Sequence, residues 1–320
     1  MQQQQFSPYA AEQPLAPVFK AMPPVGVAPI ATPHSVFTPM WQVTGAAFGG
    51  SSVLRADPET GNPDTKSTAY GGVITLNYLL APDAMIGISL TQSQSNFSSS
   101  DEYQSSSGRQ NGTGVLLSWT QLFGPYYAAG KVGFTYSKNT SQRIVTGEET
   151  IDASYASNQF TAGLEVGRKF VFSQGSITPF MGVQLTKLWQ PTYTETSTDI
   201  SDGTRGVLGQ TYQANTVTSL PTSLGVQFDT RTTIAGTTIV PFLRVAWVHD
   251  FGSVPNITVI NTINVVSSIQ GIAAPTDSAL VNVGALLSLN SNVALFGKIF
   301  GQFSNSLHSY AGTGGLRFVW

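Results

Sequence analysis

The amino-acid sequence predicts an all-β fold, a transmembrane antiparallel β-barrel of about twelve strands. Only 10% of the 320 residues are charged, against about 25% in an ordinary soluble domain, while the hydrophobic fraction is 41%. From residue 40 onward, segments alternate between apolar and small or polar residues, as in strands with one face on lipid and the other on water. No apolar run approaches the roughly 18 residues of a helical span. Because lipid tolerates only helices and closed barrels, a membrane protein with this sequence is a barrel.

Two regions differ in composition. Residues 1–39 are rich in proline, which removes helix donors and favours an extended chain. We expect them to form a linker or a segment inside the lumen, without a long helix, and residues 40–320 to form one barrel domain. Near Met1 no charged stretch precedes an apolar run, so we expect the export signal to lie upstream. The prolines of this region are at positions 8, 14, 17, 23, 24, 29, 33 and 39.

Alternation is clearest in residues 126–137 and 160–167, where even-numbered residues are mainly apolar and odd-numbered residues mainly small or polar. Short connections at 81–83, 124–125, 173–175, 232–236 and 290–292 alternate with long polar ones at 51–67, 98–110, 140–152, 191–212 and 252–278. This order predicts periplasmic turns and extracellular loops. The alternative, a soluble β-sandwich, would need a more charged surface. We expect strands to start near residues 41, 68, 85, 112, 126, 155, 177, 213, 239, 279, 293 and 309.

Several short motifs follow one another along the barrel region. They are Trp41 before a glycine-rich stretch, Tyr-Gly-Gly at 70–72, Gly-Leu-Glu-Val-Gly at 163–167, Thr-Pro-Phe at 178–180, and the segments 224–231, 243–251 and 309–320. With these motifs the sequence resembles the autotransporter β-domain family over about residues 40–320.

The resemblance implies a twelve-stranded translocator barrel of type V secretion. Such a barrel lies in the outer membrane of a Gram-negative bacterium, is inserted by the barrel-assembly machinery and supports export of an N-terminal passenger. Family members usually carry a helix through the lumen just before the first strand, where this sequence is proline-rich. The sequence itself shows no passenger domain. The alternative functions are a passenger-less pore or structural barrel and, less well supported, a barrel enzyme.

Charged side chains are expected inside the lumen, because a charge facing lipid at mid-depth costs about 2–4 kcal/mol. Alternation places an inward polar set on several strands, and we expect Glu165 and Arg244 to share a network with Asp229 or Arg231. A solvated, partly paired lumen and a polar track for an unfolded chain are both compatible with this set. Its members are Lys131, Glu165, Gln227, Asp229, Arg231, Arg244, Lys298 and Arg317.

The C-terminal residues Thr313, Gly315, Phe318 and Trp320 have a polar-x-Gly-x-x-apolar-x-aromatic spacing. This spacing resembles the signal by which the assembly machinery recognises a final strand. We expect that strand to pair with the first, near residues 41–47, because closure removes both sheet edges. The terminal tryptophan would then lie at the periplasmic interface.

Other chemistry finds little support in the sequence. The chain has no cysteine and a net charge of −2, which excludes disulfides and gives no basic block for nucleic acid. Neighbours on a strand point to opposite faces, so His249 and Asp250 are not expected to form a catalytic dyad. His249 is expected beside an aromatic girdle at the outer rim. The other histidines lack ligand spacing, so no metal, cofactor or catalytic residue is predicted.

Overall fold

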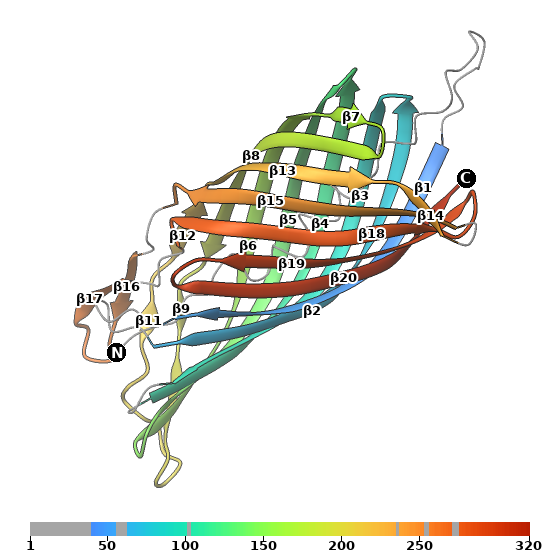
Figure 1. Cartoon of the computed structure of the whole chain (residues 1–320). Helices are drawn as coiled ribbons and strands as arrows, with labels where there is room; N and C mark the ends of the chain where they lie inside the picture. The colour runs from blue at the N-terminus through green and yellow to red at the C-terminus, as the bar shows by residue number, and fades with distance from the viewer. Residues whose placement is uncertain (1–39, 56–62, 101–103, 235–236, 253–255, 271–274) are drawn as a thin grey trace.

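In the computed structural model, twelve long antiparallel strands close into one barrel (Figure 1). The structure describes residues 40–55, 63–100, 104–234, 237–252, 256–270 and 275–320. The predicted proline-rich linker, 1–39, lies outside these residues. Around the wall the strands are β1 (Met40–Leu54), β2 (Thr65–Ala81), β3 (Ala84–Ser100), β4 (Gln104–Phe123), β5 (Tyr126–Val145), β6 (Glu149–Arg168), β8 (Gly175–Gln190), β13 (Pro221–Thr230), β15 (Thr237–Asp250), β18 (Asp277–Ser288), β19 (Val293–Phe303) and β20 (Leu307–Val319).

Shorter strands extend this wall or stand beside it. β7 (Phe170–Phe172), β10 (Thr196–Asp199), β12 (Asn215–Ser219) and β14 (Thr232–Ile234) belong to the barrel sheet. A separate four-stranded sheet contains β9 (Tyr193–Thr194), β11 (Thr211–Tyr212), β16 (Asn256–Ile260) and β17 (Val266–Gln270). Within the described part of the chain, no helix is long and apolar enough to cross a membrane.

The predicted alternation is confirmed on β5 and β6. Outward Phe134 and Leu164 are 50% and 51% exposed, whereas inward Asn139 and Glu165 are 1% and 4% exposed. Inward positions of β2 to β5 are largely serine, threonine and glycine, while Phe180 and other bulky side chains fill the lumen from the opposite wall. The lumen is thus lined by small polar groups on one side and larger side chains on the other.

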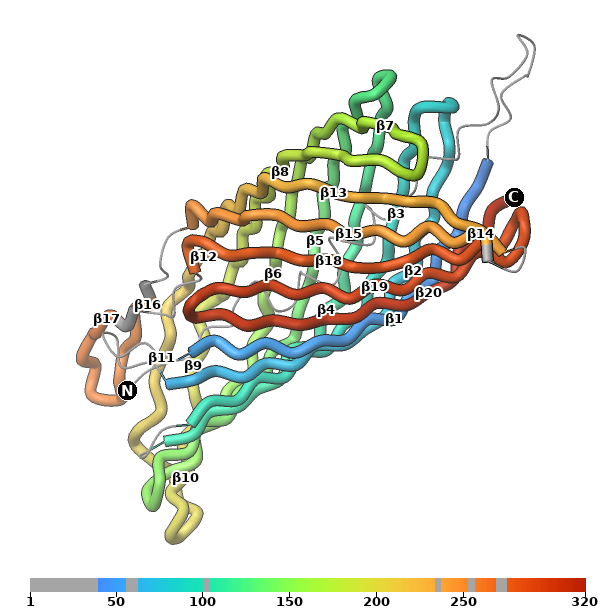
Figure 2. Tube along the Cα trace, in the orientation of Figure 1, coloured from blue at the N-terminus to red at the C-terminus, as the bar shows by residue number. Residues whose placement is uncertain are grey.

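The two ends of the barrel differ. We call the end with the short connections, such as 82–83 and 124–125, the turn end, and the opposite end the loop end. The C-terminus lies at the turn end, and β9, β11, β16 and β17 gather at the loop end (Figure 1). β3 to β6 continue past their neighbours there and form a protruding lip (Figure 2).

Two regions that were predicted to be loops are instead strands of this lip. Regions 98–110 and 140–152 are mostly strand, because β3 runs to Ser100, β4 starts at Gln104, and only three residues separate β5 from β6. The serine-rich region 98–110 carries no apolar alternation, so the pattern of its residues did not predict its pairing. The predicted polar loops at 191–212 and 252–278 also contain strands, and the second includes the β16–β17 hairpin.

The barrel closes where β20 pairs with β1, as predicted (Figure 2). The register runs from Gln42 opposite Val319 to Leu54 opposite Leu307. At the turn end, Trp41 N donates to Trp320 O at 2.9 Å, and Trp320 N donates to Trp41 O at 3.0 Å. These bonds leave neither terminal strand with an open edge, which an apolar membrane core requires.

Gly315 allows β20 to approach its neighbours closely. A Cβ at this position would lie 2.7 Å from the Phe296 ring and 2.8 Å from the Ala46 Cβ, and would also collide with the backbone oxygen of Gly45. The adjacent Gly314 faces outward, where a Cβ would meet only the Phe296 carbonyl oxygen at 3.8 Å. The two neighbouring glycines therefore provide a matched comparison.

Gly315→Ala is expected to destabilise the barrel by about 1–3 kcal/mol, the usual cost of overpacking. Gly314→Ala should have little effect. Both variants would be refolded in detergent without assembly machinery, and the loss of the folded, fast-migrating gel band would be followed against urea. Equal midpoints for the two variants would show that the seam is not tightly packed at Gly315.

Candidate functional site

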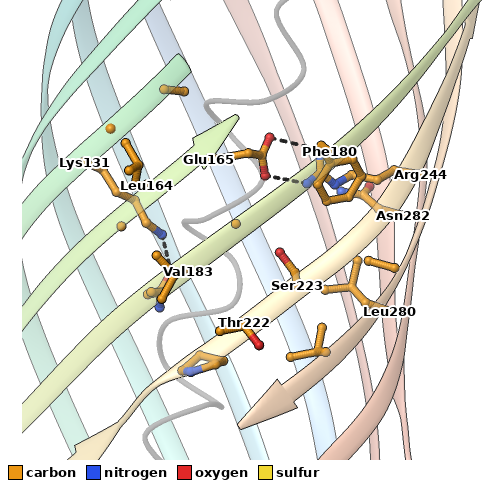
Figure 3. Close-up of a pocket in the computed structure, with 18 of the residues that line it drawn as sticks. Lys131, Leu164, Glu165, Phe180, Val183, Thr222, Ser223, Arg244, Leu280 and Asn282 are labelled. Carbon is orange, nitrogen blue, oxygen red and sulfur yellow. Dashed lines mark hydrogen bonds and ion pairs between the residues drawn. The ribbon is translucent and has the colours of Figure 1, made fainter. Parts of the chain in front are cut away.

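A buried ion pair joins β6 to β15 on the lumen side of the wall (Figure 3). Arg244 Nη2 on β15 lies 2.6 Å from Glu165 Oε2 on β6, and the two side chains are 7% and 5% exposed. Tyr127 Oη donates to Glu165 Oε1 at 2.7 Å. The Arg244 guanidinium also stacks 3.3 Å from the centre of the Phe180 ring. The predicted pairing of Glu165 and Arg244 therefore exists, and both side chains are largely buried.

Of the two predicted additional members, Asp229 joins the network indirectly. Gln227 Oε1 accepts from Arg244 Nη1 at 3.4 Å, and Gln227 Nε2 donates to Asp229 Oδ1 at 2.6 Å. Ser176 Oγ also donates to Asp229, at 3.2 Å. Arg231, in contrast, is exposed just past the end of β13. Alternation fixes the direction of a side chain only while the strand continues, and β13 ends at Thr230, so the predicted inward position of Arg231 stays a prediction.

The remaining predicted cations are separate from this network. Lys131 Nζ donates to Gln184 Oε1 at 2.5 Å. Lys298 is 5% exposed, and its Nζ has no hydrogen-bond partner among the described residues. Arg317 is half-buried near the turn end, and its Nε is similarly unpaired within the described chain.

A cavity of about 200 Å³ adjoins the ion pair inside the barrel. Its polar lining includes Lys131, Glu165 and Arg244, and Phe180 and Leu280 contribute apolar surface (Figure 3). Part of the lumen is therefore open space with fixed charges on its wall. Among the described residues, no group of three or more histidine and carboxylate side chains could hold a metal ion.

A second polar cluster, at the loop end, was missed by the sequence analysis. Arg143 Nη2 lies 2.9 Å from Glu195 Oε2, with side-chain exposures of 7% and 5%. Glu149 accepts the backbone N–H groups of Val207 at 2.8 Å and Leu208 at 2.9 Å. The cluster attaches the segment after β10 to the inner side of β5 and β6. Nothing in the sequence spacing indicated it, because each partner lies about fifty or more residues away along the chain.

The environment of Glu149 favours its charged form. It is the first residue of the 20-residue β6, at the loop end, and about 9–11 residues suffice to cross the membrane, so Glu149 lies outside the spanning part. Burial by itself would raise the pKa of Glu149. Hydrogen bonds from Ser197 Oγ and from two backbone N–H groups outweigh burial and hold this pKa below its ordinary value.

The comparisons with known proteins agree with this architecture. A family model described as the autotransporter beta-domain matches residues 43–299. The chain belongs to this family. The translocator domain of the autotransporter NalP from Neisseria meningitidis has a TM-score of 0.69 at 13% identity, covering 87% of this chain and 88% of that one. The β-domain of the Bordetella autotransporter BrkA has a TM-score of 0.63 at 16% identity, covering 88% and 99%.

A sequence relative matches part of this chain. The autotransporter CRAC of Citrobacter rodentium (strain ICC168) is 26% identical over 190 residues, 59% of this chain. The matched region spans only 11% of that protein's length. The similarity therefore concerns one part of a much longer relative.

In this autotransporter β-domain, His249 and Asp250 do not form a dyad. His249 Nδ1 lies 2.9 Å from Asp277 Oδ1, which also accepts from Trp247 Nε1 at 2.8 Å. Asp250 instead accepts the backbone N–H of Leu220 at 2.9 Å. Trp247 is 52% exposed on the outer surface, and the Phe251 ring lies 4.4 Å from the His249 ring. His249 is thus part of the aromatic rim, as predicted.

Tyr127 and Phe180, which contact the Glu165–Arg244 pair, were not predicted from the sequence. Tyr127 has the same inward parity on β5 as Lys131, so alternation alone could have found it. The predicted inward set consisted mainly of charged residues and therefore left out a phenol that donates to one of them. Phe180 could not be identified in the same way, because an inward aromatic residue is equally typical of simple lumen filling.

Removing one member of the buried pair is expected to cost about 3–5 kcal/mol, because the remaining charge is left without compensation. Glu165→Ala and Arg244→Ala should therefore lower the melting temperature of the barrel in detergent. Glu148→Ala, at the exposed β5–β6 connection, is the control. If the Glu165→Ala barrel had the same melting temperature as the Glu148→Ala control, a stabilising role for the pair would be contradicted.

Proposed function

We propose that this chain is the translocator barrel of an autotransporter, located in the outer membrane of a Gram-negative bacterium. The turn end would face the periplasm and the loop end the cell exterior. The barrel would be inserted by the barrel-assembly machinery and would support export of an N-terminal passenger. The observation that carries this proposal is the family match over residues 43–299 on a closed barrel with a polar lumen.

The lumen chemistry supports passage of an unfolded chain. Small hydroxyl side chains such as Thr75 and Ser89, whose oxygens lie 2.9 Å apart, satisfy one another and leave the wall smooth. Glu165 and Arg244 neutralise each other, so this pair does not hold a passing carboxylate or ammonium group strongly. We infer that the barrel acts without catalysis: His249 and Asp277 lie at the outer rim, away from the lumen.

Export can be tested with a signal peptide and a small reporter domain fused ahead of Met1. In a Gram-negative host, the reporter is expected to become accessible to protease added to intact cells. The signal peptide and reporter without the barrel should remain protected in the periplasm. If the barrel folds, as judged by heat-modifiable mobility, and the reporter stays protected, the chain is a passive barrel rather than a translocator.

We also propose that Thr313, Gly315, Phe318 and Trp320 form the assembly signal. Phe318 and Trp320 are 43% and 61% exposed on the outer surface at the turn end, where a periplasmic partner could reach them before insertion. The final strand is also the one that must find β1 to complete the barrel.

Phe318→Ser combined with deletion of Trp320 should slow the appearance of folded barrel in the outer-membrane fraction. Phe134→Ser removes an outward aromatic of similar exposure, 50%, from the middle of the wall and is the matched control. Both proteins would also be refolded in detergent, where no machinery acts. A C-terminal variant that inserts in cells as fast as the control would rule out the signal.

A further inference from the structure

We propose that residues 206–213 form a strap that narrows the outer mouth of the lumen and moves aside when a polypeptide leaves the barrel. The need for such movement rests on the proposed translocator function, whereas the narrowing itself does not.

The strap lies on the lumen side of the lip. Along β5, Ser137, Asn139 and Arg143 are buried and face inward, whereas Lys138 and Thr140 are exposed and face outward. Arg143 and Glu149 thus extend toward the lumen axis. Because the strap contacts the ends of these two side chains, it occupies space inside the mouth rather than outside the wall.

Polar groups hold the strap in place. Beyond the two backbone N–H groups bound by Glu149, the carbonyl oxygen of Leu208 accepts from Arg143 Nη2 at 3.4 Å. The backbone N–H of Gln210 donates to Glu195 Oε2 at 3.1 Å. Gly206 lets the chain pass directly over Glu149, since a Cβ there would collide with the Glu149 carboxylate and with Ser197 Oγ. Backbone bonds add to these contacts: Gly206 N donates to Ser197 O at 2.9 Å, Glu195 N donates to Gln210 O at 2.9 Å, and β11 pairs with β9. The strap is therefore attached to residues 193–197 by its backbone and to β5 and β6 by side chains.

The second long loop is attached to the strap. Thr262 Oγ1 donates to the carbonyl oxygen of Val207 at 2.8 Å, and Gln213 N donates to Thr258 O at 3.0 Å. Tyr212, Ile257 and Val259, which are 1%, 3% and 1% exposed, form a small apolar core between the two loops. We therefore expect strap and hairpin to move as one unit.

Opening the wall and opening the strap differ in their free-energy cost. Separating two wall strands would leave backbone groups unpaired in lipid. Lifting the strap would return Arg143, Glu149 and Glu195 to water, which recovers their hydration. Arg143 Nε and Nη1 already lack hydrogen-bond partners among the described residues, so the closed state leaves part of this burial uncompensated. Local opening at the strap is therefore far easier than opening of the barrel.

The test measures access to the lumen from outside the cell. The chain has no cysteine, so Ser137→Cys places a single thiol on the lumen face of β5, below the strap. Thr140→Cys places one on the exposed outer face of the same strand. Intact cells would be treated with a maleimide–polyethylene glycol reagent too large for general porins. Ser137→Cys is expected to react more slowly than Thr140→Cys.

Two changes should loosen the strap by independent routes. Glu149→Gln removes the charge that binds the strap, and Gly206→Ala pushes the strap and the Glu149 carboxylate apart without replacing a residue of the wall. Each is expected to accelerate labelling of Ser137→Cys by about fivefold or more, the effect of losing one buried charge-assisted contact on an opening equilibrium. Glu148→Gln, one residue away and exposed, should leave the rate unchanged.

Heat-modifiable mobility would establish that each variant is folded, and if Glu149→Gln fails to fold, Gly206→Ala carries the test. The proposal is overturned if neither variant labels faster than the parent, or if Ser137→Cys already reacts as fast as Thr140→Cys. No passenger is present in this experiment. A failed strap and a failed translocator are therefore distinguished, because the export test reports only on the latter.

Discussion

Pairing of every backbone group within a closed sheet is the constraint on which the rest of this structure depends. Lipid offers no hydrogen-bond partner, so the first and last strands must meet, and the β1–β20 register achieves this along the whole of β20. Close approach at this seam requires small residues facing one another, such as Ala46 opposite Gly315. Once the ring is closed, strand alternation decides for each wall residue whether it meets lipid or the lumen.

That division explains why charges concentrate inside and why they pair there. Glu165 and Arg244 lie on β6 and β15, with β8 and β13 between them in the wall. Their contact therefore connects a span of four wall strands. Tyr127 donates a hydrogen bond to Glu165, and the Phe180 ring stacks on the Arg244 guanidinium. A buried pair gains little over apolar packing, but it costs much if broken. We regard it as a device that fixes the shape of the lumen rather than as a source of net stability.

The sequence predicted those features that depend on local alternation. It identified the wall of β5 and β6, the closing pair of strands and the inward positions of Glu165 and Arg244, because each follows from a period of two. The sequence-based prediction failed where a strand has no alternation of apolar and polar residues, and it loses its basis where a strand ends. The serine-rich tips of β3 and β4 carry no apolar contrast, and Arg231 lies beyond its strand. The contacts of Glu149 with the loop after β10 join residues 58 and 59 positions apart, and no local pattern encodes such a pairing.

The same constraint decides where the barrel can change shape. Within the lipid, side-by-side strands are held by ladders that have no alternative partner, so the wall is effectively fixed. Beyond the lipid, at the loop end, water can replace every protein hydrogen bond, and buried charges gain hydration when they are released. Arg143, Glu149 and Glu195 lie on this side of the boundary, and so does the small apolar core of Tyr212, Ile257 and Val259. A barrel that must let a polypeptide through without separating its wall strands therefore has its movable parts in the loops. Charged side chains can hold these loops closed, because the charges are hydrated again when the loops open.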